Sequence, residues 1–130
     1  MEAIDNAGNI TQSTHTWNVG YDSSYPTTAI SATPNVPDGT NSWYLTDPTI
    51  TLTASDPNTG TNSGIQSTVY KWGVAADLSN ANFLDSGTTA YTAPFTMSST
   101  VGDGDHYLYF RSTDNAGNKE TILSLSLIHI

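Results

Sequence analysis

The sequence predicts an all-β protein, an antiparallel β-sandwich of about seven strands. Ser and Thr together make up more than a quarter of the 130 residues, and the 10 Gly and 6 Pro act as turn formers along the chain. Short stretches of alternating apolar and polar residues recur between these turn signals. No window of helical length keeps its apolar residues on one helix face, because Gly, Pro or runs of Thr and Ser interrupt it.

The first two expected strands lie on either side of a turn rich in proline. Ala29–Ala32 is a short apolar stretch, and Thr49–Ala54 alternates regularly between apolar residues and threonine. This alternation predicts that Ile50, Leu52 and Ala54 point into the core while the threonines point outward. The segment Asp56–Gly64, rich in Asn, Gly and Thr, is then expected to form a long loop.

Two longer strands are expected in the second half of the chain, at Ile65–Val74 and His106–Thr113. We expect the rings of Trp72 and Phe110 in the core, because a sandwich buries large side chains between its layers. The other expected elements are a single helical turn at most within Ala75–Asn80, a short edge strand near Pro94–Met97 and a closing strand at Lys119–Ser124.

A five-residue motif occurs twice in the chain. Asp5-Asn6-Ala7-Gly8-Asn9 recurs letter for letter at Asp114–Asn118, 109 residues later. Each copy follows the end of an expected strand and precedes another extended stretch, as a hairpin turn rich in Asn and Gly does. We therefore expect the chain to contain the end of one repeat and the whole of the next.

This repeat divides the chain into four expected segments. Residues 1–19 are expected to be the last turn and strand of a truncated preceding repeat, 20–25 a linker, 26–124 the complete repeat, and 125–130 a tail. Met1 aligns with the middle of a strand in the second copy, so we interpret it as an internal methionine. The tail matches the translation of a transposon end used to prepare sequencing libraries, and we interpret it as foreign to the natural protein. An alternating final strand is the alternative.

The composition argues against several classes of partner and of chemistry. With 3 Lys and Arg against 12 Asp and Glu, the net charge is -9, so we expect no nucleic-acid partner. The sequence contains no run of about 18 apolar residues, so we do not expect insertion into a membrane. The lack of cysteine excludes disulfides and thiolate sites. No serine-nucleophile motif is present, and Asp38, Asp47 and Asp85 lie in expected turns, so we expect no enzymatic activity.

Six short motifs follow one another in a fixed order. They are Trp43-Tyr44, Thr49–Asp56, Ser63–Ile65, Tyr91–Phe95, Asp103–His106 and Tyr109–Asn118. The series resembles the bacterial immunoglobulin-like, fibronectin-III-like repeats of large secreted and cell-surface proteins, of the type also described as OmpL47-like. The resemblance covers nearly all of Pro26–Asn118, although the loops Asp56–Gly64 and Ala75–Asp85 are longer than usual in that family.

The resemblance implies an immunoglobulin-like sandwich that acts as a non-enzymatic spacer or adhesive module. Its partners would be neighbouring repeats of the same chain and, for an adhesive module, a surface polysaccharide. It also implies an extracellular or cell-surface location, with the signal peptide outside this sequence. No cofactor is required by such a role.

A calcium ion is a further candidate ligand. The loop containing Asp56 and Asn58 and the turn containing Asp114 and Asn118 are expected at the same end of the sandwich. Their carboxylate and amide oxygens are ligands that calcium accepts. The structural alternative is that these side chains only stabilise their own turns through local hydrogen bonds.

Two tyrosines form the candidate site for an adhesive role. Tyr107 and Tyr109 alternate with the expected core residues of their strand, so they are predicted to point outward beside Arg111. Such a pair of rings could stack against sugars. Cross-strand packing on a solvated face is the alternative explanation.

Overall fold

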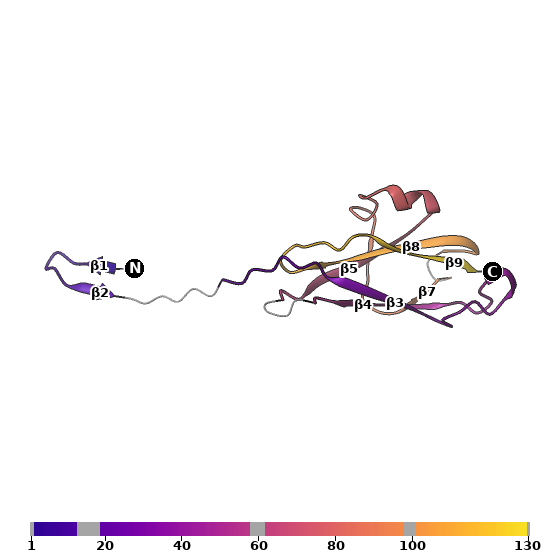
Figure 1. Ribbon diagram of the computed structural model, residues 1–130, viewed down its shortest axis with the longest axis horizontal. Coiled ribbons are helices and arrows are strands. Elements are labelled where there is room, and N and C mark those ends of the chain that lie inside the picture. The colour runs from indigo at the N-terminus through magenta and orange to yellow at the C-terminus, as the bar shows by residue number, and fades with distance from the viewer. Residues whose placement is uncertain (1, 13–18, 58–61, 98–100, 130) are drawn as a thin grey trace.

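Two antiparallel sheets of three and four strands pack face to face in the computed structural model of the protein, which describes residues 2–12, 19–57, 62–97 and 101–129 (Figure 1). The predicted all-β sandwich of seven strands is thereby confirmed. The three-stranded sheet has the order β3 (Thr27–Thr33), β4 (Thr49–Ser55) and β7 (Phe95–Thr96). The four-stranded sheet has the order β6 (Thr89–Ala90), β5 (Ile65–Gly73), β8 (Gly104–Asp114) and β9 (Leu123–His129).

A hairpin and two short helices accompany the sandwich in the described part of the chain. The strands β1 (Glu2–Ile4) and β2 (Ile10–Gln12) pair with each other in a separate hairpin that precedes it. The 3₁₀ helix η2 (Ala75–Ser79) is the single helical turn that the sequence predicts. A second 3₁₀ helix, η1 (Thr40–Ser42), was not expected from the sequence.

The core lies between the sheets and follows the predicted alternation of β4. Ile50 and Leu52 are buried, whereas Thr53 is exposed. The rings of Tyr70 on β5 and Phe95 on β7 stack at 4.2 Å across the two layers. Phe110 is buried as predicted, and Trp72 is partly buried against the core, whose buried members are Tyr44, Ile50, Leu52, Tyr70, Met97, Leu108, Phe110 and Leu127.

The closing strand lies further along the chain than the sequence predicts. The expected bounds, Lys119–Ser124, are wrong, because β9 starts at Leu123 and runs through the segment interpreted as a tail. Leu127 is only 2% exposed, and the main-chain oxygen of Ile128 accepts a hydrogen bond from Tyr44 at 2.8 Å. The alternation of Leu and Ser from Leu123 onward gives one apolar face that the core can bury, which the more polar segment before it lacks.

A buried polar network joins the two sheets near the segment between β8 and β9. The carboxylate of Glu120 accepts hydrogen bonds from the main-chain nitrogen of Thr28 at 2.8 Å and from its hydroxyl at 2.6 Å. It also accepts one from the main-chain nitrogen of Ser112 at 3.2 Å. The hydroxyl of Ser112 lies 2.7 Å from those of Thr28 and Thr68. Strands β3, β5 and β8 are therefore connected through the hydroxyl of Ser112, and Glu120 adds a second connection between β3 and β8.

Asp38 organises the long connection between β3 and β4. Its carboxylate accepts hydrogen bonds from the main-chain nitrogens of Leu45 and Thr46 and from the Thr46 hydroxyl. These bonds, that of the Thr46 hydroxyl above all, lower the pKa of Asp38 from 3.8 to about 2. Because the pKa is lower in the folded than in the unfolded state, this carboxylate stabilises the fold fully above about pH 4, and the contribution is lost as the pH falls toward 2.

We therefore expect Asp38→Asn to flatten the acid side of the stability profile. The free energy of unfolding of the wild type should fall more steeply between pH 4 and pH 2 than that of the variant. Urea unfolding at a series of pH values measures both curves, and Asp105→Asn, which removes another exposed carboxylate, is the matched control. Parallel wild-type and Asp38→Asn curves over this range would contradict the assignment.

Candidate cation site at the linker end of the sandwich

The two copies of the repeated motif fold into the same turn. The main-chain nitrogen of Asp5 donates to the oxygen of Asn9 at 3.0 Å, and that of Asp114 to Asn118 at 3.1 Å. In both copies the aspartate carboxylate accepts hydrogen bonds from the main-chain and side-chain nitrogens of the same asparagine, all at 2.8 Å. The glycine of each copy has a positive φ, 82° and 91°, which this turn requires. The hairpin prediction is confirmed at both positions.

The surroundings of the two turns differ. The first turn is exposed, whereas Asp114 is fully buried under the loop between β4 and β5. Asn115 donates from its main chain to the oxygen of Gly64 at 2.9 Å and from its side chain to the oxygen of Ser63 at 2.8 Å. The predicted placement of this loop and this turn at the same end of the sandwich is therefore confirmed.

The segment that leads into β3 reaches the same end. The side-chain nitrogen of Asn118 donates to the main-chain oxygen of Asp22 at 3.1 Å, and the main-chain nitrogen of Ser63 donates to the Asp22 carboxylate at 2.8 Å. Asp22 lies within the expected linker. Figure 1 shows this segment arriving where β8 turns toward β9, so linker, loop and turn meet at one point.

Three carboxylates meet at this point. Asp22, Asp56 and Asp114 each place an oxygen within 4.8 Å of the other two. One oxygen of Asp56 accepts a hydrogen bond from the main-chain nitrogen of Gly64 at 2.8 Å. Its other oxygen, Oδ1, is buried and has no hydrogen-bond partner. In the described part of the chain, neither Asp56 nor Asp114 forms an ion pair with a basic side chain.

The structure thus changes part of the set of calcium ligands that the sequence predicts. Asp56 and Asp114 are brought together as predicted. Asn118 instead donates its amide hydrogens to Asp114 and to the linker, so it holds the turn. Asn58 lies outside the described residues. Sequence reasoning missed Asp22, and the only signal for it was an acidic residue in the linker directly before the complete repeat.

Tyr109 is not placed as the sugar-stacking hypothesis requires. The prediction that it points to solvent is wrong, because its side chain is fully buried. Its hydroxyl donates to the main-chain oxygen of Val74 at 2.7 Å, and Phe83 packs edge-on against its ring with the centroids 4.9 Å apart. Tyr107 is partly exposed and stacks on Tyr109 at 6.4 Å. Val74 and Phe83 belong to the segment between β5 and β6, which we call the covering loop, and a sugar would have to displace this loop to reach both rings.

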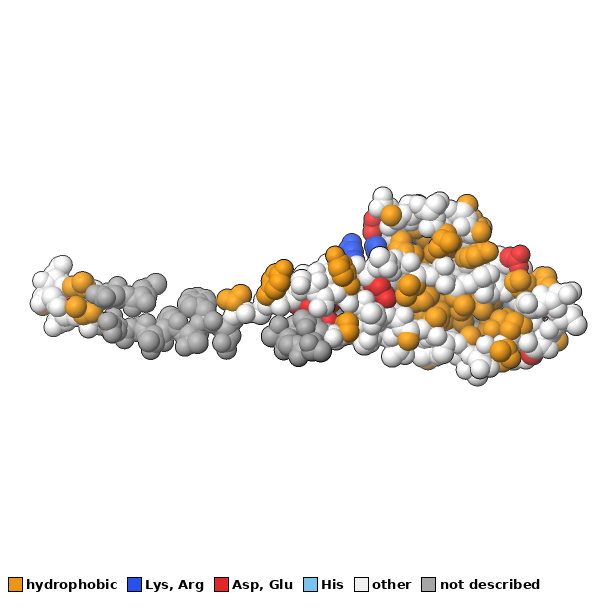
Figure 2. All heavy atoms as spheres, in the orientation of Figure 1, with side chains coloured by type: hydrophobic (Ala, Val, Ile, Leu, Met, Phe, Trp, Pro, Cys, Tyr) orange, Lys and Arg blue, Asp and Glu red, His pale blue; other side chains and the backbone are white. Residues whose placement is uncertain are grey.

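That covering loop is held by all three basic residues of the chain. Lys71 donates to the main-chain oxygens of Phe83 and Ser86, and Arg111 pairs with Asp85, to which Lys119 lies 4.0 Å away. In Figure 2 the visible basic side chains lie close together at the edge of the raised part of the sandwich, on the side nearer the linker. Arg111 lowers the pKa of Asp85 through this pairing.

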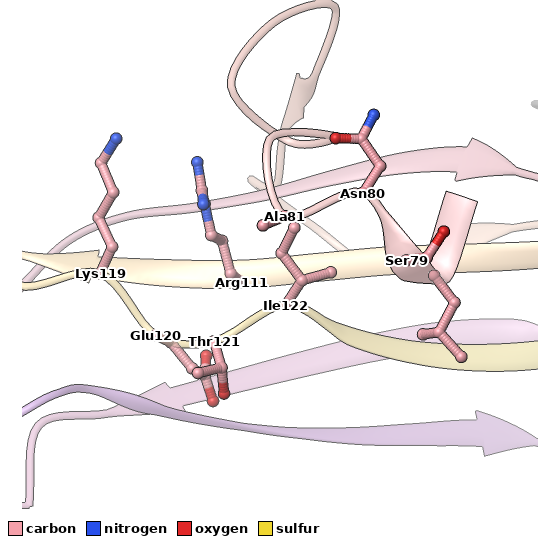
Figure 3. Close-up of a pocket in the computed structure, with 9 residues that line it drawn as sticks. Ser79, Asn80, Ala81, Arg111, Lys119, Glu120, Thr121 and Ile122 are labelled. Atoms are coloured by element: carbon pink, nitrogen blue, oxygen red, sulfur yellow. The ribbon is translucent and has the colours of Figure 1, made fainter. Parts of the chain in front are cut away.

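A surface pocket of about 410 Å³ lies beside the covering loop. Figure 3 shows Lys119 and Arg111 pointing to one side of the chain there, while Glu120 points to the other side, toward β3. The ionisable side chains of this pocket are thus engaged in the loop contacts and in the buried network. We assign them to the scaffold.

Comparisons with known proteins give no further assignment. No protein-family model matches the chain, and no curated protein is significantly similar to it in sequence. In the described ranges, none of the helices is long and apolar enough to span a membrane. The molecule is thus defined by its own features, a β-sandwich with a cluster of carboxylates where the linker joins it.

Proposed function

We propose that the chain is a non-enzymatic structural module, an immunoglobulin-like sandwich that serves as one spacer in a tandem array of a secreted or cell-surface protein. The observation that carries the proposal is the identity of the two turns. Asp5–Asn9 and Asp114–Asn118 share their sequence and each of their main hydrogen bonds. Two such turns separated by one domain length are expected of successive units in an array.

The positions of the linker and of the last strand suit a spacer. The linker joins the sandwich at the end where β8 finishes in Asp114. At the opposite end, Gly104 at the start of β8 pairs with His129 at the end of β9. The linker thus joins the sandwich at one end and β9 finishes at the other (Figure 1), so sandwiches connected in series through these points would add their lengths.

The ionisable groups inside the fold also support a structural role. Glu120 joins β3 to β8, and Arg111 holds the covering loop through Asp85 and the main-chain oxygen of Leu84. These groups satisfy the hydrogen-bonding needs of buried main chain and loop, which is the usual use of such residues in a scaffold.

The gene surrounding this sequence provides the test. We expect its reading frame to contain further Asp-Asn-Ala-Gly-Asn turns or close variants, spaced by about one sandwich, as the interval of 109 residues indicates. Sequencing long genomic fragments across the region measures this directly. Flanking sequence without another copy at similar spacing would contradict the array.

A further inference from the structure

We propose that Asp22, Asp56 and Asp114 bind one calcium ion, and that this ion fastens the linker to the end of the sandwich. The inference rests on the proposed function only where it treats residues 20–25 as a junction between units. The binding site itself depends on the three carboxylates alone.

The first argument is the balance of charge. Three carboxylates lie within 4.8 Å of one another, and Asp114 is fully buried. Like charges at such distances repel strongly, and a buried charge requires a compensating partner. For Asp56 and Asp114 no basic side chain provides it among the residues described. A divalent cation would neutralise most of this charge.

The second argument is the unsatisfied oxygen of Asp56. Buried polar atoms almost always have a hydrogen-bond partner, and an exception requires an explanation. Asp56 Oδ1 is buried without such a partner, and the carboxylate to which it belongs lies beside those of Asp22 and Asp114. Among the described residues, no hydrogen-bond donor satisfies this oxygen. An unpaired acceptor in a carboxylate beside other carboxylates is what we expect of a metal ligand in a structure without the metal.

The third argument is the size of the cluster. Oxygen ligands lie about 2.3–2.6 Å from calcium, so two ligands on opposite sides of the ion are about 5 Å apart. Three oxygens no farther than 4.8 Å from one another therefore fit in one calcium shell. The ligands come from a linker, a loop and a turn, and this irregular set favours calcium over magnesium, which demands near-ideal octahedral geometry.

The surrounding main chain holds these carboxylates in place. Ser63 and Gly64 donate their main-chain hydrogens to Asp22 and Asp56, and Asn118 donates to Asp114. Each aspartate is thereby oriented by the protein, which is how outer-shell hydrogen bonds support metal ligands. Because one ligand belongs to the linker, calcium would make the stiffness of the junction depend on the concentration of the ion.

The test is a titration of the chelator-treated protein with calcium chloride. We expect the melting temperature to rise by roughly 5 °C or more at a calcium concentration tenfold above its Kd, with a much smaller effect of magnesium. Asp56→Asn should abolish the shift, and it should not prevent folding, because it also removes repulsion. Asp105→Asn, at an exposed position near the opposite end of β8, should leave the shift unchanged.

A second measurement isolates the role of the linker. Nitrogen-15 relaxation of residues 20–25 should show calcium-dependent rigidity in the wild type and none in Asp22→Asn. A flat melting titration would overturn the site. A full melting shift that persists in Asp22→Asn would overturn the fastening of the linker. Neither result tests the proposed tandem array of sandwiches, which the sequence of the flanking gene tests separately.

Discussion

Replacing Glu120 with alanine will lower the free energy of unfolding by about 3 kcal/mol, because it leaves buried hydrogen-bond donors without an acceptor. The Glu120 carboxylate accepts from the main-chain nitrogens of Thr28 and Ser112 and from the Thr28 hydroxyl. Both of these residues are buried, so water cannot easily replace the lost acceptor. The effect should appear as a lower urea midpoint with an unchanged slope, since the surface exposed on unfolding stays the same.

Two companion variants separate this network from general effects of substitution. Glu120→Gln keeps one acceptor oxygen and the side-chain volume, so it should cost clearly less than alanine. Thr121→Ala changes the exposed neighbouring residue and should stay within about 0.5 kcal/mol of the wild type. If Glu120→Ala were as stable as Thr121→Ala, the carboxylate would not be holding β3 against β8.

The sequence was sufficient to predict the sandwich because the inner and outer faces of its strands differ in chemistry. Thr49–Ser55 alternates between apolar residues and threonine, and burial follows this alternation at Ile50, Leu52 and Thr53. The turn at Asp114–Asn118 was equally predictable, since its asparagine and glycine specify a local conformation. Both signals act between residues close in sequence.

The errors arose where the deciding contacts are distant in sequence. Tyr109 alternates with the core residues Leu108 and Phe110, and this pattern would place it in solvent on a two-layered sandwich. Instead, the segment after β5 folds back over the outer face of β8, so both faces of that strand are buried. The unusual length of Ala75–Asp85 was visible in the sequence, but the surface it covers was not.

The candidate cation site was predictable to the same limited extent. The strand order expected of the sandwich placed the loop of Asp56 beside the turn of Asp114, and the structure brings their carboxylates together. Asp22 joins them only because Ser63 and Asn118 hold the linker against the sandwich. No local pattern around Asp22 encodes these contacts, which is why spacing alone could not assign it.

Deleting residues 125–130 will abolish cooperative folding of the sandwich, the largest effect we expect of any change. The strand β9 pairs with β8 from Gly104 to Phe110, and Leu127 is almost fully buried in the core. Without these residues β8 becomes an unpaired edge over much of its length, and the core opens to water beside Leu108. Circular dichroism during urea unfolding should show a broad transition, or none, for the truncated chain.

Point substitutions in the same strand make the prediction quantitative. Leu127→Ala should cost about 2–5 kcal/mol, the range for leucine removed from a close-packed core. Ser126→Ala, on the exposed side of β9, should change the stability by no more than about 0.5 kcal/mol. A truncated chain that unfolds as sharply and at the same urea concentration as the full chain would mean that the segment is dispensable. Such a result would favour the interpretation of residues 125–130 as an appended tail, because a strand that contributes to the core cannot be removed without a loss of stability.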